Sequence, residues 1–456
     1  MKLVRRSLLI ALILTVAIPL SASAQGPSTY TVGIQIANLD TTGSAAIEIT
    51  YYNQDGTVAT TFPETITAGG SKTYDPIHAA DGFNGSVIIS SDREVAAIAN
   101  LLGNSGAFGG ASYDSFSQGA TSANIPLIAK NFYGIYTWFN VQNTGSVDAN
   151  VTVTYAGSPA PTCTETGTIK PGAAKTFKQQ TSSCLSNNFL GAATVTTGGS
   201  DQTIAVAVVE HSSQSLLAFD AFTTQGSTSP VMPLISHKYY NSRTGIQIMN
   251  TGGTNTNVTM TYTPSTGFPG TACSETKLIE AHKSANFGDT SFFEQASLPC
   301  GPMSGTNQSN FGFAGSAKVT ANSANQNLVA IVNSVTSGTA NSAAYASFAA
   351  SAATNKVNFP LVMDRVYGIF TGFSVANVGT QPTNILCTFS GTSYTASQNN
   401  VQPGQSMTTV QLNQISNGYS GAANCTATGG DALIVGVVSE LGGQGDKLLY
   451  YEGFNY

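Results

Sequence analysis

The sequence predicts an all-β protein made of four tandem antiparallel β-sandwich domains. Short runs of alternating apolar and polar residues end at Gly, Asn or Pro, and no segment after residue 24 shows a sustained apolar period of 3.6 residues. Apolar residues make up 41% of the chain and fall on one face of each run, which argues against disorder despite the abundant Gly, Ser and Thr. One pattern of motifs also recurs four times along the chain.

Residues 1–24 have the features of a secretory signal peptide. Three cations precede an apolar stretch over residues 7–20, and Ala22-Ser23-Ala24 supplies a cleavage site. The stretch is short for a membrane anchor, and small polar residues follow it at once. We therefore expect a secreted chain that starts at Gln25 and has no transmembrane anchor.

The charge of the chain excludes some classes of partner. Lys and Arg number 17 against 23 Asp and Glu, a net charge of −6 that becomes more negative once the three leader cations are removed. An acidic chain of this kind is a poor match for nucleic acid or for an anionic membrane surface. We expect no nucleic-acid partner.

Four anchors recur in the same order. The first is an Asn that closes a strand, at Asn38, Asn143, Asn250 and Asn377, with spacings of 105, 107 and 127 residues. The second is a Gly that opens a later strand, at Gly85, Gly191, Gly315 and Gly421. An apolar strand follows, and then an aromatic residue with a Phe three positions on, at Tyr113/Phe116, Phe219/Phe222, Tyr345/Phe348 and Tyr451/Phe454.

The anchors divide the mature chain into four repeats, and each is long enough for one two-layer core. We place them at residues 25–120, 121–226, 227–352 and 353–456. Each holds seven or eight short strands with turn signals every 8–12 residues, the pattern of a sandwich. Four such domains in series are compatible with a rod, with the bend at each linker undetermined.

Alternation identifies the core. The inward pairs before the anchor Asn are Ile34/Ile36, Phe139/Val141, Ile246/Ile248 and Phe373/Val375. Two further core positions are occupied by Ile49, Val153, Met260 and Cys387 and by Ile89, Val195, Val319 and Cys425. Cys387 and Cys425 thus replace apolar core residues of the other repeats, and we expect a disulfide between them.

The remaining cysteines also pair by repeat. Cys163 and Cys184 lie in the second repeat, and Cys273 and Cys300 occupy matching places in the third. An even number in a secreted context favours three intradomain disulfides. Metal ligation is the alternative, but there is no C-x-x-C and the four histidines lie at non-equivalent places, so we expect no metal.

Motifs of the common catalytic sites are missing from the sequence. There is no G-x-S-x-G, H-E-x-x-H or P-loop, and the acidic residues are too scattered to nominate a carboxylate pair. We expect no catalytic residue, no cofactor and no enzymatic activity.

Trp138, the only Trp, is the most conspicuous binding candidate. It occupies an outward-facing strand position where the other repeats have Gly, and Tyr133 and Tyr136 lie close by in the sequence. These aromatics would suit stacking on a sugar ring or docking of a partner. We favour the simpler interpretation, in which Trp138 packs against its own linker or the neighbouring domain.

The third repeat carries an insertion between residues 287 and 310. Insertions at sandwich loops are places where binding functions collect. A neutral surface elaboration, held by Cys300, is the simpler interpretation.

A Pro-Leu segment opens the second, third and fourth repeats, at residues 124–130, 231–238 and 358–365, and the first repeat has none. We favour the interpretation that these segments are rigid linkers. The alternative is an edge strand, which leaves either the first or the last domain one strand short. Another subunit could fill such a gap by strand addition.

The stretch "IQIANLDTTGSAAIEITYYNQDGTVATTFPETITAGGSKTY" resembles the immunoglobulin-like, cell-adhesion-related repeats of bacterial surface proteins. The resemblance covers the first half of each repeat. It implies four immunoglobulin-like domains in an extracellular structural or adhesive module, and it carries no site residues across.

Two functions are consistent with these features. We expect a secreted structural or adhesive protein of a bacterial cell surface or extracellular matrix, with surface components or itself as partner. The alternative is an extracellular carbohydrate-binding protein that uses the aromatics around Trp138, with polysaccharide as partner.

Overall fold

The computed structural model describes residues 10–14, 30–103, 109–213, 215–223, 226–239, 241–268, 270–293, 300, 312–323, 326–337, 339, 341–442 and 448–456. The expected cleavage site after Ala24 and most of the insertion in the third repeat lie outside them. The described residues confirm an all-β fold of antiparallel sheets that pair into sandwich-like domains. No helix among them is long and apolar enough to cross a membrane.

The first domain contains β1 (Ile10–Leu14), β2 (Tyr30–Asn38), β3 (Ala45–Asn53), β4 (Val58–Ile66), β5 (Ser71–Tyr74), β6 (Gly85–Ser91), β7 (Val95–Gly103) and β8 (Gly110–Asp114). The second contains β9 (Ser122–Phe132), β10 (Ile135–Asn143), β11 (Ala149–Ser158), β12 (Glu165–Ile169), β13 (Ala174–Lys178), the 3-10 turn Gln179–Thr181, β14 (Phe189–Thr197), β15 (Ile204–His211) and β16 (Leu216–Asp220).

The third domain contains β17 (Pro230–Tyr239), β18 (Ser242–Asn250), β19 (Thr256–Pro264), β20 (Cys273–Ile279), β21 (Ser284–Phe287), α1 (Thr290–Phe293), β22 (Phe313–Ala321), β23 (Leu328–Thr336), β24 (Ser342–Ala346), β25 (Phe348–Ala349) and the 3-10 turn Ala350–Ala352. The fourth contains β26 (Lys356–Asp364), β27 (Ile369–Asn377), β28 (Thr383–Phe389), β29 (Thr395–Val401), β30 (Ser406–Val410), β31 (Tyr419–Thr428), β32 (Ile434–Gly442), β33 (Leu449–Glu452) and β34 (Phe454–Asn455).

All four domains share one strand order. If the eight main strands are lettered A to H along each domain, one layer has the order D-C-F-A and the other E-B-G-H. The neighbours B–E and C–F are those of an immunoglobulin sandwich. Strand A pairs with F, and strand G pairs with B. In the second and third domains, pairing between A and B joins the two layers into one continuous sheet.

The expected cores are confirmed. All four inward pairs before the anchor Asn are buried, as are the two further sets of equivalent core positions. Three disulfides are also confirmed, Cys163–Cys184, Cys273–Cys300 and Cys387–Cys425, each within one domain. Cys387 and Cys425 face each other on β28 and β31, where the other domains have apolar pairs.

The anchor Asn ties the two layers of each domain together. In the fourth domain, Asn377 Nδ2 donates to the carbonyls of Gln381 (2.8 Å) and Val401 (2.8 Å), and its Oδ1 accepts from the Gly379 backbone N–H (2.9 Å). Asn38, Asn143 and Asn250 make the same kinds of bonds. The side chain thus closes the turn after strand B and holds the end of strand D, which explains the recurrence of this residue.

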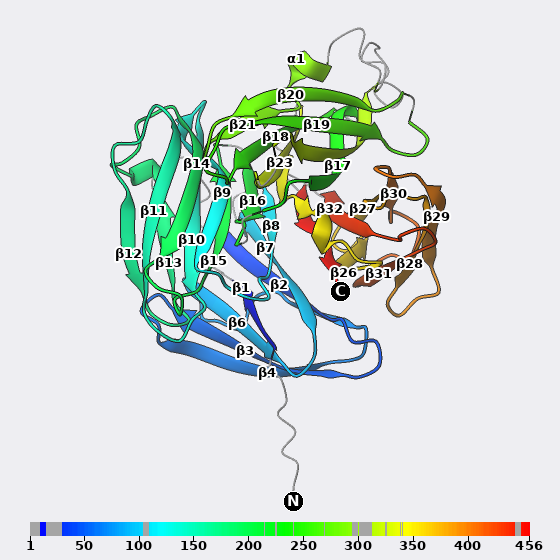
Figure 1. The fold of residues 1–456 in the computed structure, drawn as a ribbon. Coiled ribbons are helices and arrows are strands. Elements are labelled where there is room, and N and C mark those ends of the chain that lie inside the picture. The colour runs from blue at the N-terminus through cyan, green and yellow to red at the C-terminus, as the bar shows by residue number, and fades with distance from the viewer. Residues whose placement is uncertain are drawn as a thin grey trace, which may run out of the picture.

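The four domains close into a ring rather than extending as a rod (Figure 1). Strands β8, β16, β24 and β33, the H strands, contact one another at the centre. Hydrogen bonds cross all four junctions. An example from each, in order, is Ser86 Oγ to the Gly172 carbonyl, Asn333 Nδ2 to Glu210 Oε2, Ser406 Oγ to the Pro233 carbonyl, and Gln35 Nε2 to the Pro360 carbonyl. The last of these joins the fourth domain to the first.

The interpretation of the Pro-Leu segments as linkers is wrong. They form β9, β17 and β26, the A strands of the domains that they open, paired with β14, β22 and β31. Because Pro lacks a backbone N–H, the pairing shifts register at the Pro-Leu step in each of them. In the first domain β1 takes this place beside β6.

We predict that Asn377→Ala lowers the free energy of unfolding by about 2–3 kcal/mol, because the substitution leaves buried carbonyls without their donor. Thermal unfolding followed by circular dichroism would show a Tm several degrees below that of the wild type. Asn399→Ala, at an exposed position on β29, is the matched control and should leave the Tm unchanged. Equal Tm values for both variants would contradict a structural role of the anchor.

Candidate functional site

The centre of the ring collects three acidic side chains. The H strands end in Tyr113-Asp114, Phe219-Asp220, Tyr345-Ala346 and Tyr451-Glu452. Each aromatic ring is buried in the core of its own domain. Because side chains alternate along a strand, the next residue points away from that core and toward the other three H strands.

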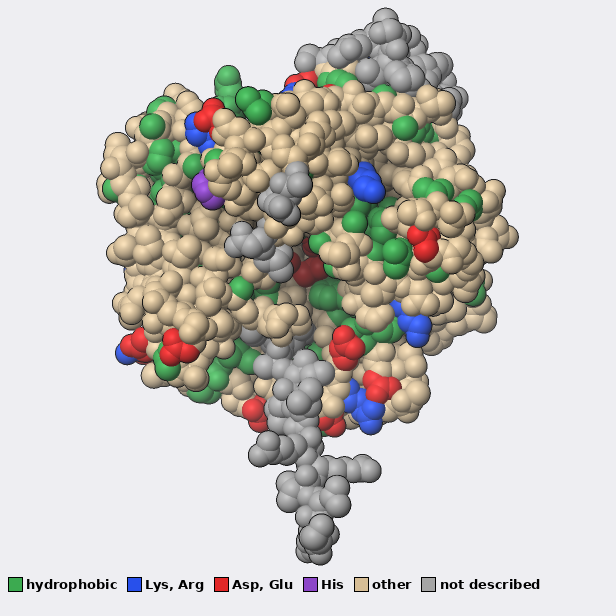
Figure 2. Space-filling model, in the orientation of Figure 1, with side chains coloured by type: hydrophobic (Ala, Val, Ile, Leu, Met, Phe, Trp, Pro, Cys, Tyr) green, Lys and Arg blue, Asp and Glu red, His purple; other side chains and the backbone are tan. Residues whose placement is uncertain are grey.

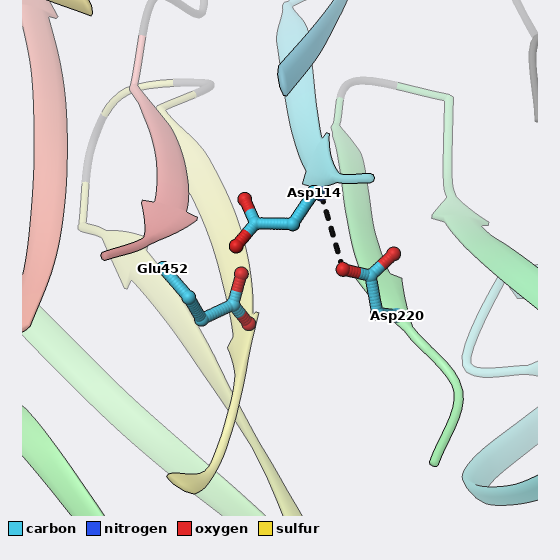
Figure 3. A group of neighbouring side chains, drawn as sticks. All are labelled: Asp114, Asp220 and Glu452. Carbon is cyan, nitrogen blue, oxygen red and sulfur yellow. Dashed lines mark hydrogen bonds between the residues drawn. The ribbon is translucent and has the colours of Figure 1, made fainter. Parts of the chain in front are cut away.

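Asp114, Asp220 and Glu452 form what we call the central carboxylate cluster (Figure 3). One carboxylate oxygen from each lies within 4.8 Å of the others. Asp114 and Glu452 are only 7% and 8% exposed, and Asp220 is partly exposed. Figure 2 shows a hollow near the middle of one face of the ring, with an acidic side chain at its bottom.

Backbone groups supply part of the hydrogen bonding of the cluster. The Asp114 N–H donates to Asp220 Oδ2 (3.1 Å), and the Ala346 N–H donates to Glu452. Asp114 Oδ1 and Asp220 Oδ1 are buried without a hydrogen-bond partner. No ion pair within the described part of the chain involves any of the three carboxylates.

Burial disfavours the charged form of these groups. Loss of water raises the pKa of Glu452 to about 7. It also raises the pKa of Asp114 and of Asp220 well above the usual range, and repulsion from Glu452 adds to both shifts. Three neighbouring carboxylates therefore need either protons or a cation to balance their charge.

Two kinds of chemistry fit this arrangement. Carboxylate oxygens are the preferred ligands of Ca²⁺ and Mg²⁺, so Asp114, Asp220 and Glu452 could hold such a divalent cation between the domains. Without a cation, shared protons would hold the carboxyl groups together at acidic pH. In either case we expect the packing of the first, second and fourth domains to depend on pH or on the cation concentration.

Two further buried carboxylates lie at domain junctions. Asn100 Nδ2 donates to both oxygens of Glu440 (3.1 Å each), and Asn333 Nδ2 donates to Glu210 Oε2 (2.7 Å). Burial raises the pKa of Glu210 and of Glu440 to about 7, although the bond from Asn opposes this shift. These pairs join the first domain to the fourth and the second to the third.

The structure does not bring the aromatic binding candidates into one exposed surface. Trp138 is 4% exposed and packs with the core of the first domain. It faces away from the core of its own domain, as expected, and the neighbouring first domain covers it, as the packing interpretation predicts. Tyr136 is half-buried and stacks on His211. Tyr133 is 90% exposed at the turn between β9 and β10. A Trp in this interface is not available to stack on a sugar.

A mainly apolar cavity of about 570 Å³ lies between the third and fourth domains. Leu234, Tyr239, Phe370, Leu448 and Tyr450 are among its lining residues. None of the three cluster carboxylates lines it.

Comparisons with known proteins give no relative from which function could be carried over. No family model matches the chain, and no curated protein matches it. Among solved structures, the trypsin-activated alpha-2-macroglobulin from Escherichia coli aligns with 98% of this chain at 9% identity and a TM-score of 0.11. The alignment spans 42% of that protein, and at this TM-score it carries no argument.

The cluster was not recognised in the sequence, although a signal for it exists. The residue after the aromatic of the fourth anchor is acidic in three of the four repeats. Alternation places this position on the face opposite the core. Only the closure of the ring shows that the three positions meet.

We predict that stability falls as pH rises from about 4 through about 7 when divalent cations are removed. Carboxyls with a raised pKa bind more protons in the folded state than in the unfolded state over this range, so each contributes a fall of up to about 1.4 kcal/mol per pH unit. Asp220→Asn should make the fall shallower and raise the Tm at pH 8 in EDTA. Asp81→Asn, on an exposed loop, should change neither.

Added Ca²⁺ or Mg²⁺ distinguishes the two kinds of chemistry. A cation held by the cluster would raise the Tm of the wild type at pH 8 and have less effect on Asp220→Asn. Identical pH profiles for the wild type and Asp220→Asn, with and without cation, would contradict any role of the cluster.

Proposed function

We propose that the chain is a secreted, non-catalytic structural or adhesive protein of a bacterial cell surface or extracellular matrix. Three disulfides within three of its domains support an oxidising, extracellular location. The surface visible in Figure 2 is dominated by uncharged groups with few charged side chains, which suits contact with other surfaces. The resemblance to cell-adhesion-related repeats points in the same direction.

The observation that supports an adhesive role is a pair of exposed tyrosines on equivalent turns. Tyr133 and Tyr367 are 90% and 96% exposed at the turn between strands A and B of the second and fourth domains. Each tyrosine is followed by a Gly. Both residues of each Tyr-Gly dipeptide have positive φ, as a tight type I′ hairpin turn requires. A rigid turn thus presents an amphipathic ring to solvent, the kind of group enriched at binding surfaces.

The carbohydrate-binding alternative loses its main support, because Trp138 is buried between the first two domains. Tyr133 remains available for contacts of either kind. We therefore favour surface or matrix components, or a second copy of the protein, as the partner.

Secretion is tested by the intact mass of the protein recovered from outside the cells that produce it. We expect a chain that begins at Gln25 and has no free thiol, because all six cysteines are paired. Recovery of the unprocessed chain inside the cell with reactive thiols would contradict the proposal.

Adhesion is tested by binding of the purified protein to the surface of its own cells. We predict that the double substitution Tyr133→Ser and Tyr367→Ser reduces retention at least severalfold at an unchanged Tm, since neither ring is buried. Leu278→Ser removes another exposed apolar side chain, on β20, and should retain binding. Equal retention of the wild type and the double variant would refute the role of the tyrosines.

A further inference from the structure

The first domain receives its A strand in a different way from the other three. In those domains, strand A is 9–11 residues long and belongs to the mature chain. In the first domain the strand is β1, five residues that lie within the expected signal peptide. Removal of residues 1–24 would therefore take away the strand that pairs with β6.

The register shows that β1 occupies a true A-strand position. Leu12 faces Ile89 on β6, as Ala123 faces Val195 on β14. In the fourth domain, Val357 faces Cys425 on β31 in the same way. Ile89, Val195 and Cys425 are the equivalent core positions, so the first domain keeps the receiving edge of the other domains.

A second feature of this receiving edge is the tyrosine of the fourth anchor. In the third and fourth domains, the Tyr345 and Tyr451 hydroxyls donate to the carbonyls of Leu234 and Leu361, in the Pro-Leu step of strand A. The first domain has a buried Tyr113 at the same position. It thus retains the side chain that holds a Pro-Leu strand elsewhere.

The sole tryptophan lies in the same apolar cluster as this edge. Trp138 belongs to the cluster that contains Val87 and Ile89 of β6.

We infer that, once residues 1–24 are removed, the edge of β6 is a receptor for an extended apolar segment of a different protein. The segment adds antiparallel to β6, as β1 does in this structure, and covers the core of the first domain. A second copy is a poorer donor, because its own Pro-Leu strands are held inside their domains. The inference rests on the processing step of the proposed function, and it supplies a kind of partner that this function leaves open.

The sole tryptophan, Trp138, provides the readout. The probe is a synthetic peptide with the sequence of residues 122–132, which is strand A of the second domain. Titrated into the chain of residues 25–456, it should give a saturable change in Trp138 emission and raise the Tm. The full chain, whose β1 occupies the edge, should bind at least tenfold more weakly. A peptide carrying I125D, which replaces a core-facing Ile, is the matched control and should not bind.

Three binding results would overturn the inference: no emission change or Tm shift for a folded 25–456 chain, equal binding by both chains, or equal binding of the I125D peptide. Self-association of residues 25–456 that the peptide suppresses would overturn the assignment to a different protein, since a second copy would then be the occupant. A secreted protein that retains residues 1–24 would also overturn it, because β1 would be the permanent strand. That last result leaves the adhesive function standing.

The processed chain without a partner is expected to be the least stable form. If it does not fold, the sequence of residues 122–132 can be fused before Gln25 through a flexible Gly/Ser linker. The fusion should then be a folded monomer. A fusion that stays unfolded would show that β6 does not accept a Pro-Leu strand.

Discussion

The closed arrangement depends on the alternation of side chains along the last strand of each domain. The aromatic residue of that strand completes the core of its own sandwich, so its neighbour must face away from the core, toward the other domains. Four such strands meet at the centre, and three of the neighbours are acidic. The same alternation that stabilises each domain therefore places like charges together where water is scarce.

Closure of the ring makes this unfavourable placement tolerable. Backbone N–H groups of the H strands donate to Asp220 and Glu452, and asparagine amides donate to Glu210 and Glu440 at the junctions. Buried acids of this kind are costly when charged, and the raised pKa values express that cost. Apolar clusters cross the junctions of the ring, and we expect the ring to respond to protons and cations at its centre.

Features that depend on one repeat were predictable from the sequence. The inward pairs, the recurring Asn and the pairing of Cys387 with Cys425 all follow from alternation within one hairpin or one core. Features that depend on two domains were not. The meeting of Asp114 with Glu452 requires the ring, which brings together residues more than 300 positions apart. Packing of Trp138 on a neighbouring domain was one of two interpretations, and only the contact between the first and second domains decides between them. The Pro-Leu segments were misjudged because Pro argues against a regular strand, whereas the register shift accommodates it.

The closure of four sandwiches into one compact ring determines the dimensions of the protein in solution. Small-angle X-ray scattering of the monomeric protein tests it directly. A compact body of about 430 residues has a radius of gyration of about 22 Å. Four domains of roughly 35–40 Å in a row would instead give a value near 40 Å or more. A value close to 22 Å is the result predicted here, and a value near 40 Å would contradict the ring.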